Sequence, residues 1–191
     1  MKSPKLLVAV AAGLTLAVAG CGSEESESTS SAGGNGIDRA FAAQMIPHHE
    51  SAIQMAEIAQ NRGKTAFVKG LADDIVRTQS DEIDTLRAQD AELERAGVKP
   101  GDLGMDEDMM GMNEDPAMLE DANPFDAKFI DMMIPHHQGA VEMAKVERDK
   151  GADPELKSLA QDIIDAQERE ISEMRKHVAG GGDSIDDMDH G

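Results

Sequence analysis

The sequence predicts an all-α protein, a four-helix bundle of the ferritin-like kind. The first observation is an internal repeat: the segment that starts at Phe41 recurs at Phe129, an offset of 129 − 41 = 88 residues, and each copy contains Met-Ile-Pro-His-His. The second is that apolar residues in both copies recur three or four positions apart, the helical period. The third is a long segment between the copies, which would join two helical hairpins by one crossover. A solenoid is the competing architecture, but two repeats are too few for one.

The first 20 residues are typical of a secretory signal. A basic start precedes an apolar run over residues 6–19, which is short for a membrane span, and small residues precede Cys21. Val-Ala-Gly-Cys at this point resembles the bacterial lipobox, in which the cysteine is lipidated and becomes the first mature residue. The alternative is an ordinary signal peptide with an incidental cysteine. We expect an extracytoplasmic protein, lipid-anchored to the bacterial cell membrane at Cys21.

Changes in composition divide the rest of the chain. Residues 22–36 are rich in Ser, Glu and Gly and cannot bury enough apolar surface to fold, so they are expected to form a flexible tether. The expected organisation is a signal peptide over 1–20, a lipidated cysteine and tether over 21–36, a bundle over 37–179 with repeats 38–95 and 124–178 and a linker 97–123, and an acidic tail over 180–191.

Composition also limits the function. The chain has 38 acidic against 18 basic residues and a formal net charge of −20, which argues against nucleic acid and anionic lipid surfaces as partners and favours cations. It has no Trp or Tyr for stacking on bases or sugars, and its single Cys excludes an internal disulfide.

Four helices are expected, over residues 38–61, 65–95, 124–150 and 154–178. Asp38 can cap the first helix and Gly63 can stop it. Pro47 and Pro135 fall inside the first and third helices, directly before the histidine pairs, where each removes one main-chain hydrogen bond and can kink the helix. The alternative is that each helix starts at its proline.

The repeated motif supplies candidate metal ligands. On a helix, Met45, His48 and Met55 share one face and His49 lies at its edge, because neighbouring residues point about 100° apart. Imidazole and thioether together suit copper, and thioether favours Cu(I), whereas structural zinc would call for thiolates. The candidate ligands from both copies are Met45, His48, His49, Met55, Met133, His136, His137 and Met143.

Other interpretations of these residues remain open. Methionines at helical spacing are often simple core residues. The histidines could be buried and hydrogen-bonded to Gln79 and Gln167, or they could open the bundle when acid protonates them. A ferritin-like oxidoreductase is disfavoured, because no Glu-x-x-His sequence of a di-iron site occurs, and no enzymatic activity is expected. Copper binding is expected to weaken below about pH 6.

The linker is a second candidate region. Methionines stand there among acids, interrupted by Gly and Pro, so no helical stripe explains them. They could be auxiliary Cu(I) ligands or could pack over the bundle. These auxiliary candidates are Met105, Met109, Met110, Met112 and Met118, with His190 in the tail.

The pattern MIPHHxxAxxMA, present twice, resembles the domain of unknown function 305 family over Asp38 to Val178. That family is ferritin-like in fold, has no common established activity and includes a periplasmic copper-binding protein rich in Met and His. The resemblance implies a copper-binding protein that buffers, stores or hands over Cu(I), or Cu(II), through the candidate ligands above. Its metal-transfer partner is not implied.

Overall fold

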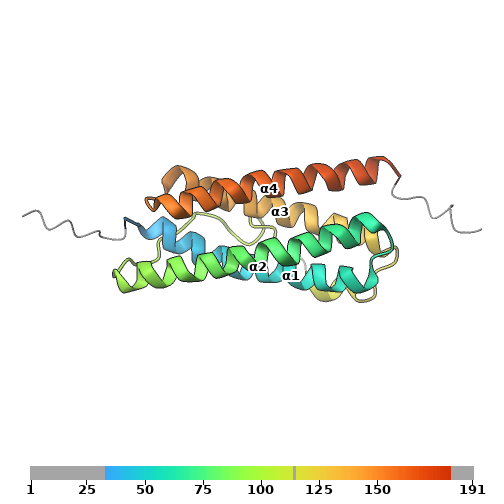
Figure 1. The fold of residues 1–191 in the computed structure, drawn as a ribbon, viewed down its shortest axis with the longest axis horizontal. Coiled ribbons are helices and arrows are strands. Elements are labelled where there is room, and N and C mark those ends of the chain that lie inside the picture. The colour runs from blue at the N-terminus through green and yellow to red at the C-terminus, as the bar shows by residue number, and fades with distance from the viewer. Residues whose placement is uncertain (1–32, 114, 182–191) are drawn as a thin grey trace, which may run out of the picture.

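The computed structural model describes residues 33–113 and 115–181, and within them it confirms the all-α four-helix bundle, with no strand (Figure 1). Cys21, His190 and the expected signal segment lie outside the described residues, so lipidation and export stay predictions. The helices are α1 Gly36–Arg62, α2 Ala66–Arg95, a short 3-10 helix η1 Pro116–Leu119, α3 Phe125–Lys150 and α4 Pro154–Ala179.

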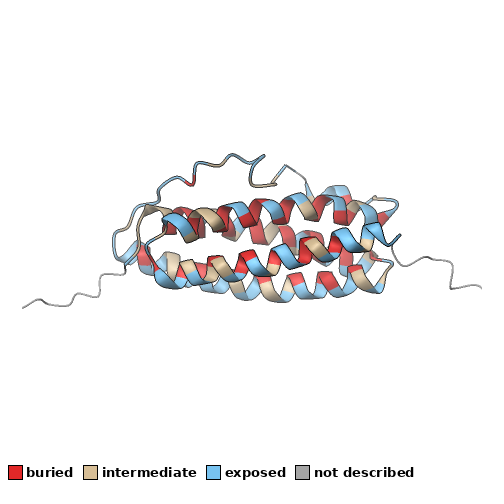
Figure 2. Cartoon of the chain, turned by 90° about the horizontal axis from the view of Figure 1, so that it is seen from above, coloured by how far each residue is buried: buried red, intermediate tan, exposed pale blue. Residues whose placement is uncertain are grey.

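Each repeat forms an antiparallel hairpin, α1 with α2 and α3 with α4, and α1 packs antiparallel on α3 between the two hairpins (Figure 1). The segment between α2 and α3 is the predicted crossover. It carries η1 and runs along one side of the bundle (Figure 2). None of the described helices is both long enough and apolar enough to cross a membrane.

The start of α1 differs from the prediction by a few residues. The N-cap is Asn35 rather than Asp38, and the two form a capping box in which each side chain bonds the other's backbone N–H. Asp38 is also fully buried and accepts hydrogen bonds from the backbone N–H groups of Ala152 and Asp153, at 3.0 and 2.8 Å. It is therefore tied to the α3–α4 turn.

The repeat-related Asp126 makes the reciprocal connection. Its carboxylate accepts hydrogen bonds from the backbone N–H groups of Lys64 and Thr65, at 2.9 and 2.8 Å, in the α1–α2 turn. Each hairpin thus satisfies the orphan backbone donors in the turn of the other hairpin. These two contacts fix the register in which α1 and α3 meet.

Both prolines lie inside their helices, Pro47 in α1 and Pro135 in α3, so the alternative that each helix starts at its proline is wrong. Packing explains this outcome: Phe41 and Phe129, one or two turns earlier, are fully buried and hold the first turns in helical register.

The buried side chains form two apolar clusters, which line the inner faces of the helices (Figure 2). On every helix a polar stretch separates the members of one cluster from those of the other. The buried polar residues of this middle layer are His48, His49, Gln79, His136, His137, Gln167 and Glu170.

Candidate metal centre

The two His-His pairs lie in the polar layer at the middle of the bundle. His48, His49, His136 and His137 are between 0% and 2% exposed, so none of the four rings reaches solvent. Burying an imidazole without a partner costs free energy. The arrangement of their nitrogen atoms is therefore informative.

His48 and His136 meet across the interface between α1 and α3. Their ring centroids are 3.8 Å apart and the rings are tilted by 40°. Within each pair the rings are farther apart, 6.1 Å for His48 and His49 and 6.5 Å for His136 and His137. One histidine of each repeat therefore points inward to its counterpart.

The other histidine of each repeat points to a carboxylate. His137 Nε2 donates a hydrogen bond of 2.7 Å to Glu170 Oε2. His49 Nε2 lies 2.8 Å from Glu82 Oε2, an ion-pair contact that lacks hydrogen-bond alignment. Helical spacing predicts His49 at the edge of its face, but the residue is fully buried and contacts α2.

Glu82 and Glu170 are not among the candidates that the sequence predicts. A usable signal existed, because the two occupy the same position in the repeats, 170 − 82 = 88 residues apart. The alternative that leaves the histidines as core residues has Gln79 and Gln167 as their hydrogen-bond partners. That alternative is wrong for Gln167, whose amide atoms have no partner within the described residues.

His48 is held by the linker rather than by a helix. Its Nε2 lies 2.9 Å from the carbonyl oxygen of Met110. A carbonyl only accepts, so Nε2 must carry the proton and Nδ1 must carry the lone pair.

The Nδ1 atoms of all four histidines are buried, and none has a hydrogen-bond partner in the part of the chain that the structure describes. His136 lacks a partner at Nε2 as well, among the same residues. A histidine ring that donates Nε2–H to an oxygen acceptor and leaves Nδ1 free has the usual arrangement of a metal-ligating histidine.

His48 and His136, the two central histidines that meet between α1 and α3, are neutral in the folded protein. Burial, and next the neighbouring His49, lower the pKa of His48 to about 3. Burial, and next His48, lower the pKa of His136 well below its ordinary value. Both rings therefore keep a lone pair at any physiological pH. The expectation that acid near pH 6 protonates them in the folded state is wrong for these two.

The four candidate methionines of the repeated motif are all fully buried, on either side of the histidine layer. Met45 and Met143 belong to one apolar cluster, and Met55 and Met133 belong to the other. Met45 precedes His48 by one helical turn, as Met133 precedes His136, so each central ring has a thioether-bearing residue next to it on its own helix.

The linker methionines divide into two groups. Met105 and Met110 are partly buried and pack against the cluster that contains Met45 and Met143, as the packing alternative predicted. Met112 is partly buried, whereas Met109 and Met118 are 52% and 50% exposed. The exposed members stay available to a cation from solvent.

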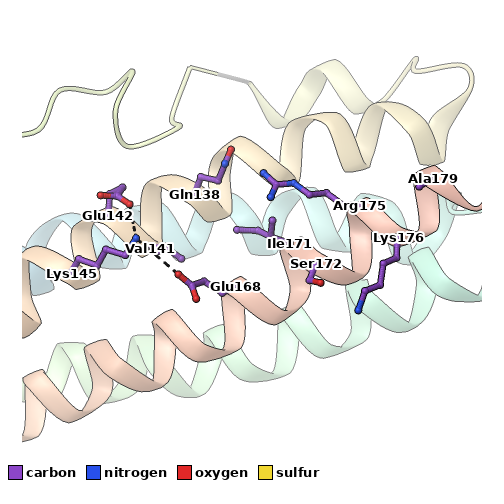
Figure 3. Close-up of a pocket in the computed structure, with 10 residues that line it drawn as sticks. All are labelled: Gln138, Val141, Glu142, Lys145, Glu168, Ile171, Ser172, Arg175, Lys176 and Ala179. Atoms are coloured by element: carbon purple, nitrogen blue, oxygen red, sulfur yellow. Dashed lines mark hydrogen bonds and ion pairs between the residues drawn. The ribbon is translucent and has the colours of Figure 1, made fainter.

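A surface concavity lies away from the histidine layer. It is a groove of about 660 Å³ between α3 and α4, where Lys145 pairs with Glu142 and Glu168 (Figure 3). None of the candidate ligands lines it. Within residues 33–113 and 115–181, no three His, Cys, Asp or Glu side chains form a preformed metal site.

Comparison with protein families gives a match over residues 17–91 and 38–178 to the domain of unknown function DUF305. A curated relative, the uncharacterized protein L153 of Acanthamoeba polyphaga mimivirus, is 45% identical over 49 residues, which are 26% of this chain and 32% of that protein. The match therefore spans about a third of the relative's length.

Solved structures match over most of the chain. CopM in the Cu(I)-bound form is 34% identical, with a TM-score of 0.62, over 75% of this chain and 96% of that one. CopM was also solved with Ag and with Cu(II) bound. A DUF305 fragment from Deinococcus radiodurans is 30% identical, with a TM-score of 0.65, over 76% of this chain and 97% of that one.

Proposed function

The chain belongs to the DUF305 family, and from that premise we propose that it binds copper ions in the core of its helical bundle. The observation that carries the proposal is the set of four buried Nδ1 atoms, supplied by two repeat-related histidine pairs, that find no partner among the described residues. An unpartnered buried imidazole costs stability in the empty protein, and ligation of a cation relieves that cost.

The chemistry of the layer favours Cu(I) over harder ions. The available donors are the imidazoles of the layer and the thioethers in the apolar clusters on either side. Imidazole suits copper, and soft thioether ligands select Cu(I). Glu82 contacts His49 and Glu170 contacts His137, and the two carboxylates supply the negative charge that a buried cation needs. Copper-bound forms of the relative CopM support the same choice.

The biological role that we propose is buffering, storage or hand-over of copper outside the cytoplasm, from a lipid anchor at Cys21. The exposed linker methionines would act as auxiliary collectors. The acid-responsive alternative predicts that the bundle opens in acid whether or not copper is present, so a copper titration and an acid titration distinguish the two functions. No catalytic activity is part of the proposal.

The deciding experiment uses the protein from Ser23 onward, titrated with Cu(I) against a competing chelator and with Zn(II) and Fe(II) in parallel. We expect a tight, copper-selective stoichiometry and a rise in melting temperature that follows copper occupancy. Absence of binding at micromolar copper would leave the histidines as core residues and would refute the proposed function.

A further inference from the structure

The linker forms a turn, Asp106–Met112, that contacts the histidine layer at His48. It is closed by backbone hydrogen bonds from Met110 to Asp106, 3.0 Å, and from Met112 to Glu107, 3.1 Å, and the Asp106 carboxylate accepts from the Met109 N–H at 2.9 Å. A turn with this many internal bonds can hold one of its carbonyl groups in a fixed place.

Two glycines let this turn approach α3 closely. A Cβ atom at Gly139 would overlap the Met110 carbonyl group, and a Cβ atom at Gly111 would overlap the Pro135 carbonyl oxygen. Gly111 also has a φ of +70°, which side chains disfavour. The repeat-related residue of Gly139 is Ser51, since 139 − 88 = 51, so the close approach is built into one repeat only.

This approach brings the Met110 carbonyl to His48 and leaves His136 without an equivalent. His48 Nε2 donates to that carbonyl at 2.9 Å, whereas neither nitrogen of His136 has a partner within the described part of the chain. Among the described residues, the turn therefore supplies a carbonyl acceptor to only one of the two repeat-related rings.

We propose that the Met110 carbonyl is a positioning group of the copper centre: it fixes His48 in the Nε2–H tautomer, so that Nδ1 is the nitrogen offered to the ion. The two repeats are consequently inequivalent, with His48 preset and His136 free to choose its tautomer. The carbonyl also increases the basicity of Nδ1 and so strengthens its bond to a cation. The inference rests on the proposed function, because it concerns the same site.

The first test needs no metal. Nitrogen and carbon chemical shifts of the imidazoles, measured by NMR on the copper-free protein, report the tautomer of each histidine. We expect a single Nε2–H tautomer for His48 and a mixture for His136. An Nδ1–H tautomer or an even mixture at His48 in the wild type would overturn the inference.

Paired variants then move the turn. G139A adds a methyl group on α3 and G111A adds one on the turn, so each should separate the turn from α3 and remove the tautomer preference of His48. Their matched controls are S51A, at the repeat-related position, and G104A, which has nearly the same backbone conformation, φ +73°, but open space around its Cβ. The controls should leave His48 in the Nε2–H form. Circular dichroism establishes that each variant stays helical, and if one variant does not fold, the other still decides.

The copper arm follows the same variants. Loss of an outer-shell partner of a ligating histidine costs about 10–100-fold in metal affinity, and we expect that loss for G139A and G111A but not for S51A or G104A. Wild-type affinity in both turn variants would refute the positioning role. Failure of the wild type to bind copper would instead refute the proposed function, while the tautomer measurement would still test the hydrogen bond.

Discussion

His48 and His136, which stand 88 residues apart at the same position of two repeats, have ring centroids 3.8 Å apart in the middle of the bundle. The contact places two neutral imidazoles between two apolar clusters. It means that a single ion could contact both halves of the molecule, so that one change on α1 and one on α3 should affect the same centre.

Replacement of His48 and His136 together by Ala should therefore abolish tight Cu(I) binding and the copper-dependent rise in melting temperature, because both central donors are lost. Chelator competition measures the first effect and calorimetry the second. His177, which stacks on Phe67 at 4.3 Å, provides the control, and H177A should bind as the wild type does. Unchanged stoichiometry and affinity in the double variant would rule out the histidines as ligands.

Cu(I) affinity should also depend on the carboxylates of Glu82 and Glu170. Replacing either by Gln removes the negative charge next to His49 or His137, and we expect each variant to lose about 10–100-fold in Cu(I) affinity. The exposed Glu173 on α4 gives the matched control, E173Q, which should leave affinity unchanged. Equal affinity in all three variants would show that the two carboxylates serve packing alone.

The exposed linker methionines should add capacity without adding to the tight site. Replacing the two exposed methionines, Met109 and Met118, by Leu keeps their volume and removes their thioethers. We expect fewer Cu(I) ions bound at saturation, with unchanged affinity for the first ion and an unchanged melting temperature. If the number of ions at saturation does not change, the methionines have no collecting role.

Stability of the copper-free protein should decrease in acid because of the central histidines. Burial lowers the pKa of His48 from 6.5 to about 3 and lowers that of His136 in the same direction. The unfolded chain thus binds more protons between these values, so the contribution is complete above pH 6.5 and is lost as the pH falls toward 3, on the order of a few kcal/mol. Denaturant unfolding should show a smaller acid loss in the H48Q/H136Q variant. An identical acid profile would contradict neutral burial of the two rings.

Glu147 should have the opposite effect on the pH dependence of stability, which it makes decrease as the pH rises. Burial, and next the adjacent Asp38 carboxylate, raise its pKa to about 8, against 4.5 for the free group. The folded protein therefore keeps a proton that the unfolded chain releases, and stability decreases as the pH rises from about 4.5 to 8. E147Q cannot ionise, so it should be more stable than the wild type at pH 8 by on the order of a few kcal/mol, with little advantage near pH 4.5. A stability difference between E147Q and the wild type that stays constant from pH 4.5 to 8 would refute the raised pKa of Glu147.

The bundle itself was predictable from sequence because helical periodicity is a local property. Met45, His48 and Met55 share a face by spacing alone, and a repeat at a constant offset predicts two similar hairpins. The sequence predicts Asp38 as the N-cap, whereas the structure has Asn35. Both are good capping residues, and only the backbone conformation distinguishes them.

The partners of the histidines depend on the tertiary structure. The Glu82 and Glu170 contacts and the meeting of His48 with His136 require the rotation and register of one helix against another, which Asp38 and Asp126 fix across the hairpins. The Met110 carbonyl reaches His48 because the crossover, 62 residues later in the chain, packs against a glycine on α3. The sequence alone determined the repeated helices and the donor types. Only the packing between helices decided which donor meets which partner, since such contacts join residues far apart in the chain.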